Sequence, residues 1–136
     1  MPPFFDTNIL LYAFDEDEPE KQSVSRELID EHLTRGDGIL SVQVLREFYS
    51  VSRRESRPLS VEDAVEAVNY FATFALGPED AETVLGAIRR SREYMLSFWD
   101  ALIVESALRC GADRLLTEDL QHGQTIEGLR IENPFL

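Results

Sequence analysis

Four acidic residues stand at comparable places along this chain of 136 residues. Asp6 follows the apolar run Pro-Phe-Phe, Glu47 lies within an apolar stretch, Asp100 opens another, and Asp119 closely follows a pair of leucines. Converging carboxylates repel one another unless a cation neutralises them. Carboxylate oxygens suit Mg²⁺ or Mn²⁺, and either metal can activate water and stabilise charge on a phosphodiester. The four acids together therefore predict a metal site for phosphodiester hydrolysis.

Each acid also has a purely structural explanation. Asp6 can cap a helix that starts at residue 7 or 8. Asp100 stands three residues after a serine, which is the spacing of a capping box. Glu118 or Asp119 can form a turn after a strand. Glu47 is harder to explain in this way, because it lies about two turns into its helix beside the buried stripe.

The composition favours one globular domain over residues 1–136, with 43% hydrophobic and 10% aromatic residues. The single cysteine, Cys110, excludes an intramolecular disulfide and a cysteine-rich zinc site. The chain has only two histidines, which makes a histidine-based metal site or a serine–histidine–aspartate triad possible but poorly supported. The sequence shows no signal peptide and no apolar run long enough to span a membrane, so we expect a soluble, cytoplasmic protein.

The net charge of −13 argues against nonspecific binding of nucleic acid, which depends on neutralising phosphates. The basic residues are twelve arginines and one lysine, and several arginines are grouped. These groups either form solvated helix faces or contact phosphates. They consist of Arg53, Arg54 and Arg57, and of Arg89, Arg90 and Arg92.

Short apolar segments alternate with segments of helical periodicity. We expect strands at 3–5, 39–41, 74–76 and 114–116, an edge strand within 125–132, and helices at 8–14, 19–35, 42–54, 61–70, 80–92 and 98–108. This alternation predicts an α/β sandwich with a mainly parallel sheet. In such folds ligands bind beyond the carboxyl ends of the strands, which is where the acids are placed.

One large side chain and two histidines have simpler expected roles. Trp99 stands in a segment that is apolar nearly all round, so we expect it in the core. His32 is expected on a helix surface. His122 is expected in a turn, although it lies close to the predicted site.

Four segments resemble PIN-domain proteins, and in particular the VapC-type toxins of bacterial toxin–antitoxin pairs. They are FFDTNIL, SVQVLREFY, FWDALIVESAL and LLTEDLQHGQ…GLRIENPF. The resemblance spans essentially the whole chain, with the segments in the family's order and spacing. It implies a three-layer α/β/α sandwich with a mainly parallel central sheet, and the activity of a metal-dependent endoribonuclease.

The resemblance also implies roles for individual residues. Asp6, Asp100 and Asp119 would hold one or two Mg²⁺ or Mn²⁺ ions, and Glu47 would complete the site or polarise the attacking water. In-line attack would leave a 5′-phosphate and a 3′-hydroxyl. The alignment of the motif favours Asp119 over Glu118 as the acid that faces the metal.

Further residues and partners follow from the same resemblance. Thr7 and Thr117 match hydroxyl positions that orient a carboxylate or water, and Asn8 matches a structural position of the first motif. Arginines of the two groups, including Arg53, Arg54 and Arg89, would hold flanking phosphates. The implied partners are an RNA substrate, a small antitoxin and a second copy of the chain, with no membrane.

Other functions remain open at this stage. A PIN-like module that binds RNA or a partner without cutting it would be expected to lack one of the four acids, but all four are present in this sequence. A phosphoacceptor signalling domain would need an acidic pair near the first strand and a lysine after a late strand, but the one lysine, Lys21, stands in the second predicted helix. DNA nucleases share the same metal chemistry.

Overall fold

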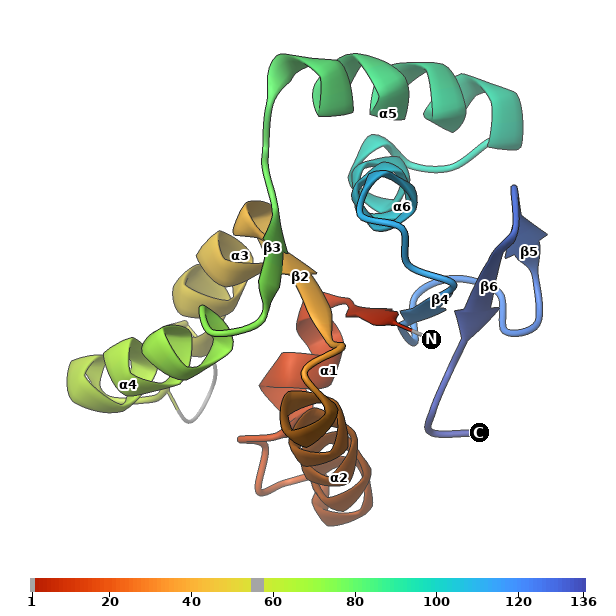
Figure 1. Cartoon of the computed structure of the whole chain (residues 1–136). Helices are drawn as coiled ribbons and strands as arrows, with labels where there is room; N and C mark the ends of the chain where they lie inside the picture. The colour runs from red at the N-terminus through yellow and green to blue at the C-terminus, as the bar shows by residue number, and fades with distance from the viewer. Residues whose placement is uncertain (1, 55–57) are drawn as a thin grey trace.

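A six-stranded sheet forms the centre of the protein (Figure 1). The computed structural model describes residues 2–54 and 58–136, so Arg57 lies outside the described residues. The strand order is β3-β2-β1-β4-β6-β5, and every neighbouring pair is parallel except β5 and β6. The strands are β1 (Pro3–Phe5), β2 (Ile39–Ser41), β3 (Ala75–Gly77), β4 (Arg114–Leu116), β5 (Thr125–Ile126) and β6 (Leu129–Glu132).

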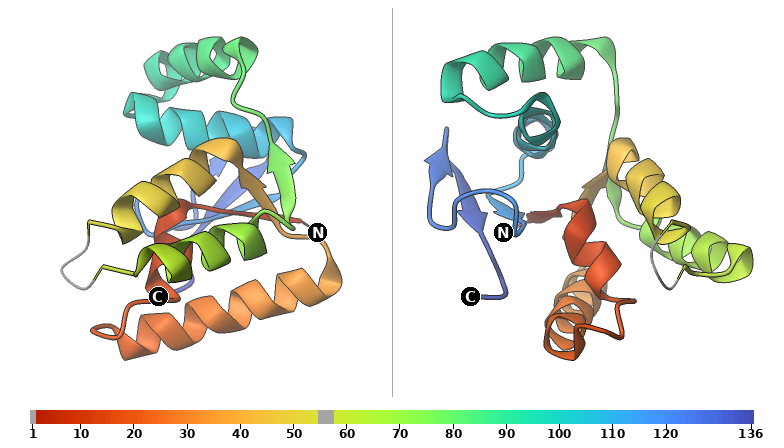
Figure 2. Two further views of the ribbon diagram at one scale, coloured as in Figure 1. Left: turned by 90° about the vertical axis from the view of Figure 1, so that its left-hand side faces the viewer. Right: turned by 180° about the vertical axis from the view of Figure 1, so that it is seen from behind.

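Helices cover both faces of this sheet, which confirms the three-layer α/β/α arrangement (Figures 1 and 2). One face carries α6, which contacts β2, β3 and β4, with α5 packed on its outer side. On the other side, α1 contacts both α2 and α3, and α3 contacts α4. The helices are α1 (Thr7–Tyr12), α2 (Pro19–Arg35), α3 (Val42–Ser52), α4 (Val61–Phe71), α5 (Ala81–Tyr94) and α6 (Phe98–Arg109). None of the helices in the described part of the chain has the length and apolar character needed to span a bilayer.

The helix ends follow local sequence signals. Helix α2 begins at Pro19, whose fixed φ suits a first helical position, and it ends before Gly36, which has the left-handed φ of 69°. The other helices begin with a polar side chain that accepts a hydrogen bond from a backbone N–H of the first turn. These N-caps are Asp6, Ser41, Ser60, Asp80 and Ser97.

The edge segment at 125–132 differs from the single strand that we expected. It is a hairpin in which β6 pairs with β4 and only the two-residue β5 lies at the edge. Glu127 and Gly128 form the turn with φ of 48° and 89°. Positive φ at both central residues is the mark of a tight hairpin turn, and glycine adopts it without strain.

The expectation that Trp99 lies in the core is wrong. Its side chain is 64% exposed, in the first turn of α6, and packs edge-on against Phe98. The buried part of α6 begins only at Ala101. The all-round apolar pattern therefore identifies a central helix but does not apply to its first turn.

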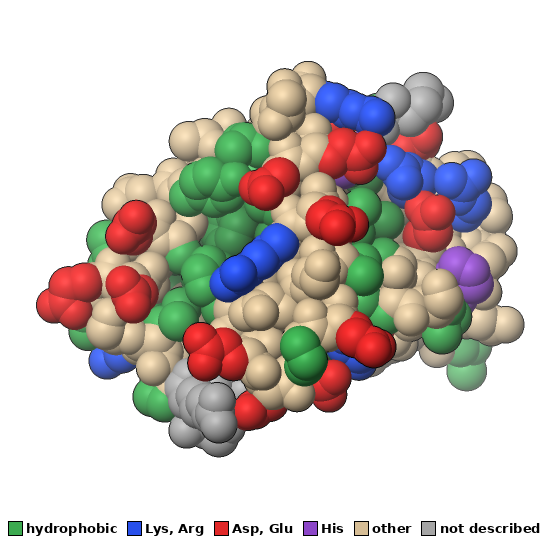
Figure 3. Space-filling model, turned by 90° about the horizontal axis from the view of Figure 1, so that it is seen from below, with side chains coloured by type: hydrophobic (Ala, Val, Ile, Leu, Met, Phe, Trp, Pro, Cys, Tyr) green, Lys and Arg blue, Asp and Glu red, His purple; other side chains and the backbone are tan. Residues whose placement is uncertain are grey.

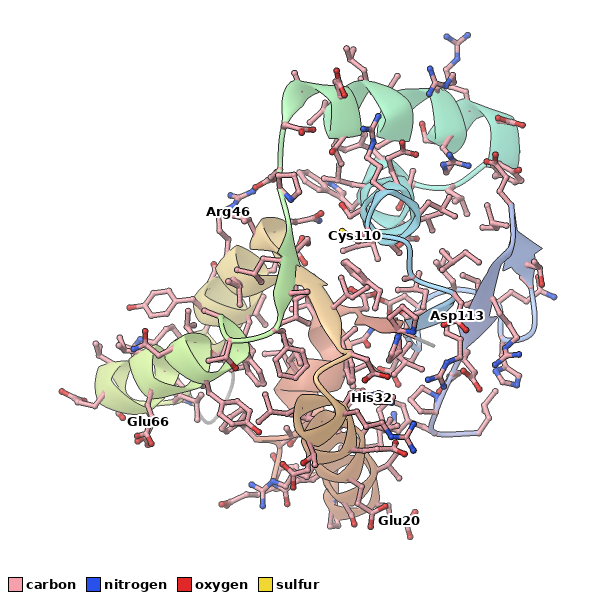
Figure 4. The ribbon with its side chains drawn as sticks, viewed as in Figure 1. Glu20, His32, Arg46, Glu66, Cys110 and Asp113 are labelled. Carbon is pink, nitrogen blue, oxygen red and sulfur yellow. The ribbon has the colours of Figure 1, made fainter. Side chains whose placement is uncertain are left out.

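The expectation that His32 lies on a surface is also wrong. Its side chain, which is labelled in Figure 4, is 2% exposed. Its Nδ1 lies 2.7 Å from Asp37 Oδ1. The buried face of α2 runs through Ser25, Ile29 and His32, a spacing of four and three residues. The hydrogen bond to Asp37 satisfies the imidazole, which makes its burial tolerable.

We predict that Gly86→Ala destabilises the protein, although glycine in a helix interior is ordinarily less favourable than alanine. An added Cβ would lie 2.3 Å from Glu105 Oε1 and 2.7 Å from its Cδ. Glu105 is buried and accepts hydrogen bonds from Arg90 and Arg109. Moving its side chain to make room for the Cβ would therefore break these contacts. Urea unfolding should show a loss of about 1–3 kcal/mol. A more stable variant would mean that Glu105 moves freely.

Candidate functional site

The site begins where β1 and β4 end side by side. Phe5 pairs with Leu116, so the next residues, Asp6 and Thr117, are neighbours at the carboxyl edge of the sheet. Thr117 Oγ1 donates a hydrogen bond of 2.8 Å to Asp6 Oδ2, and the backbone N–H of Thr7 donates one of 2.7 Å to Oδ1. Asp6 is thus both the N-cap of α1 and a buried carboxylate at a strand end, so the two sequence interpretations are compatible.

Glu47 reaches this edge from α3, and both of its carboxylate oxygens are held. Thr7 Oγ1 donates to Oε2 and Gln43 Nε2 donates to Oε1, each at 2.8 Å. The sequence analysis named Thr7 but missed Gln43. The available signal was its position one helical turn before Glu47, which puts the two side chains on the same face.

The remaining two acids come from other elements. Asp119 is exposed, and its backbone N–H donates to Thr117 Oγ1 at 3.0 Å. Asp100 lies half-buried in the first turn of α6, where its N–H donates to Ser97 Oγ at 3.1 Å. The structure thus contains the capping and turn hydrogen bonds of the structural explanations, and these bonds use the backbone N–H of each acid rather than its carboxylate.

The charges of the four acids act on one another. Burial raises the pKa of the Asp6 carboxyl from 3.8 to about 7, the hydrogen bonds from Thr117 and Thr7 oppose this shift, and the charges of Asp119 and Glu47 add to it. Burial also raises the pKa of Asp119, a hydrogen bond donated by Asn8 opposes the shift, and the charges of Asp100, Glu118 and Glu47 increase it. Elements distant in sequence therefore bring the acids into one electrostatic site.

Glu118, the alternative to Asp119, is engaged elsewhere. Its carboxylate accepts hydrogen bonds from the Tyr12 hydroxyl and from Lys21 Nζ, the latter at 3.0 Å. Asp119 has no basic partner among the described ion pairs, and its backbone N–H donates to Thr117, the residue that holds Asp6. This geometry favours Asp119 as the acid of the site.

The donor set fits a hard divalent cation. Among residues 2–54 and 58–136, no three acidic, histidine or cysteine side chains are close enough to form a complete metal cluster. Hydroxyls of Thr7 and Thr117 hold individual carboxylates instead. Two buried amide oxygens, Asn8 Oδ1 and Gln43 Oε1, have no hydrogen-bond partner within the described part of the chain. Carboxylate and amide oxygens are the ligands that Mg²⁺ and Mn²⁺ prefer, so this edge of the sheet could hold either ion.

The arginines named from sequence do not gather at this edge in the described residues. Arg53 donates to the carbonyl of Leu59, and Arg54 Nε donates to the carbonyl of Ser50 at 3.2 Å. Arg90 pairs with Glu105 inside the α5–α6 layer, and Arg89 is exposed on α5. Their predicted contact with phosphates stays a prediction.

A groove of about 380 Å³, lined by both apolar and acidic side chains, adjoins the site. Asn8 belongs to both, since its amide approaches Thr117 and it also lines the groove. Acidic side chains are spread over the molecular face that contains the outer side of α2, with apolar side chains between them (Figure 3). The groove is lined by Asn8, Leu11, Tyr12, Phe14, Asp15, Glu16, Asp17, Phe48, Ser52 and Leu59.

The fold and the site define a class of protein: a mainly parallel α/β/α domain with a buried acid, Asp6, at the carboxyl edge of its sheet. A sequence model of the PIN domain matches residues 4–125. The chain therefore belongs to the PIN-domain family. A search of curated proteins found no match to it.

Solved structures share the whole fold at low sequence identity. DNA-bound VapBC from Salmonella typhimurium matches with a TM-score of 0.70 and 18% identity, over 98% of each chain. A toxin–antitoxin complex from Klebsiella pneumoniae matches with a TM-score of 0.68 and 18% identity, over 97% of each chain. VapC20 of Mycobacterium tuberculosis is a toxin that cleaves the sarcin–ricin loop. It matches with a TM-score of 0.64 and 16% identity, over 86% of this chain and 89% of that chain. At these identities the likeness establishes the fold.

Proposed function

We propose that this protein is a metal-dependent endoribonuclease and the toxin of a type II toxin–antitoxin pair. The observation that carries the proposal is that two threonines link three acids at the carboxyl edge of the sheet: Thr117 holds Asp6 and accepts from the Asp119 N–H, and Thr7 holds Glu47. Membership of the PIN-domain family and the fold shared with VapC-type toxins support it. RNA as the substrate rests on this likeness.

Each residue of the site has a separate role in the proposed hydrolysis. Asp6, Asp100 and Asp119 would hold Mg²⁺ or Mn²⁺, which when bound supplies charge stabilisation at the phosphodiester and acidifies water. Glu47 would accept the proton of the attacking water. Each of its oxygens already accepts one hydrogen bond, and an ionised carboxylate has further lone pairs for a water molecule. Thr7 orients this acid, so the base is in place before substrate binds.

The groove beside the site supports an antitoxin as partner. Leu11, Phe48 and Leu59 offer apolar contacts along it, and Asp15 adds negative charge at its border. A partner with apolar side chains and a nearby arginine or lysine would complement both features. Because Asn8 links the groove to the acids, a basic side chain of such a partner would compete with the cation for the same carboxylates.

A second copy of the chain is also part of the proposal. Leu85, Met95 and Trp99 are 64%, 88% and 64% exposed along α5 and at the start of α6. Clustered exposed apolar side chains favour a protein contact. We propose that this side of the molecule mediates dimer formation, and that the protein acts in the cytoplasm.

The direct test is cleavage of total cellular RNA by the purified chain. We expect discrete fragments with Mg²⁺ or Mn²⁺ and none with EDTA, because the carboxylates alone cannot stabilise an anionic phosphodiester. Single-stranded DNA of matched length, incubated in parallel, distinguishes an RNA nuclease from a general one. Fragments that persist at the same rate in EDTA would contradict the proposal.

A further inference from the structure

Glu118, next to the site acid Asp119, is held in a compact cluster. Its Oε2 lies 3.0 Å from Lys21 Nζ, and its Oε1 accepts a hydrogen bond from the Tyr12 hydroxyl. Lys21 Nζ also lies 3.3 Å from that hydroxyl, so the three polar groups contact one another. Lys21 is the only lysine of the chain.

The C-terminal segment closes this cluster. The ring of Phe135 packs edge-on against Tyr12 with a centroid distance of 5.2 Å, and Lys21 Nζ lies 5.4 Å from the centre of the Phe135 ring. Lys21 Nζ lies 4.7 Å from the Tyr12 ring as well. We call Tyr12, Lys21, Glu118 and Phe135 the Glu118 clasp. It joins α1, α2, the segment after β4 and the end of the chain.

The clasp solves an electrostatic problem at the site. Glu118 stands between Thr117, which bonds Asp6, and Asp119. A free Glu118 would be a fifth carboxylate beside four others. It could also compete with Asp119 for a cation, since the two are adjacent in sequence and equally suitable as ligands. Lys21 neutralises this charge where it stands.

We propose that the Glu118 clasp is a positioning device that turns Glu118 away from the site and so presents Asp119 to the cation. This inference rests on the proposed metal-dependent function. Tyr12, Lys21 and Glu118 are positioning residues, because they act through Asp119 and touch neither metal nor substrate. The C-terminal Phe135 contributes by packing over the hydroxyl and ammonium groups.

The test is Mn²⁺ binding to the RNA-free protein, with free Mn²⁺ measured by electron paramagnetic resonance. Lys21→Met keeps the aliphatic stem and removes the charge, which leaves Glu118 ionised and held by Tyr12 alone. We expect Mn²⁺ affinity to fall about tenfold, as for loss of a group that orients a metal ligand. In Lys21→Met/Glu118→Gln the affinity should return close to the wild-type value, because the amide introduced at position 118 has no charge to compete and still accepts from Tyr12.

Arg35→Met is the matched control. It removes the same charge from the other end of α2, about 21 Å away along the helix, where Arg35 pairs with Glu31 one turn before it. Thermal unfolding in EDTA establishes that each variant is folded. Wild-type affinity in folded Lys21→Met, or a loss that Glu118→Gln does not reverse, would overturn the clasp as a positioning device. A wild-type protein that binds no Mn²⁺ would overturn the proposed metal chemistry and the clasp with it.

Discussion

Asp6→Asn is expected to reduce metal-dependent RNA cleavage by about a thousandfold or more, equivalent to about 4 kcal/mol of transition-state stabilisation. The substitution removes the charge of the most deeply buried carboxylate of the site, which is 7% exposed. Asparagine keeps the shape and remains a good N-cap, so its side-chain oxygen can still accept from the Thr7 N–H. Loss of cleavage would then reflect lost charge rather than a lost cap.

The measurement compares initial cleavage rates and unfolding midpoints of the wild-type protein and the variant. Asp63→Asn is the matched control, because Asp63 stands exposed in the first turn of α4, away from the four acids. The control should retain wild-type activity. An Asp6→Asn variant that folds and cleaves normally would mean that Asp6 serves only as a helix cap.

The second large effect is on stability in the absence of metal. Because burial raises the pKa of Asp6 from 3.8 to about 7, the folded state keeps a proton that the unfolded state releases over this range. The free energy of unfolding should therefore fall as pH rises from about 4 to about 7, by about 1.4 kcal/mol per unit at most. The total loss of free energy of unfolding over this range reaches at most about 4 kcal/mol. The raised pKa of Asp119 acts in the same direction.

Urea unfolding in EDTA at pH 5, 6, 7 and 8 measures this effect. Asp37 and Asp80 have lowered pKa values, so they stay ionised in both states over this range, and the difference between the wild type and Asp6→Asn isolates the contribution of Asp6. The variant should gain relative stability as pH rises. Mn²⁺ added at pH 8 should restore stability to the wild type and much less to the variant. Parallel pH profiles for the two proteins would contradict the prediction.

Most of the fold could be predicted from sequence because its signals are local. Pro19 and Gly36 bound α2 where the sequence indicated, and Ser60 and Ser97 cap α4 and α6. Propensity, capping and turn chemistry operate within a few residues of the chain. The hairpin at 125–132 was missed because two short strands and one strand with a central break have similar apolar patterns.

The acids of the site were identifiable by their positions after strands or within helices. Asp6 follows β1 and Asp119 follows β4, and parallel neighbouring strands bring their carboxyl ends to one edge. That their charges act on one another depends on packing between α1 and α3 and on the pairing of β1 with β4. Their roles as ligands stay predictions.

The sequence by itself determined the order of the elements, their caps and the candidate acids, because these depend on near neighbours. Only the tertiary structure decided that Gln43 and Thr7 hold Glu47, that Lys21 and Tyr12 hold Glu118, and that Trp99 is exposed. The physical reason is that burial and hydrogen-bond partners are set by side chains that lie far apart along the chain, such as Lys21 and Glu118. No local pattern encodes which of two adjacent acids finds a lysine and which remains available to a cation.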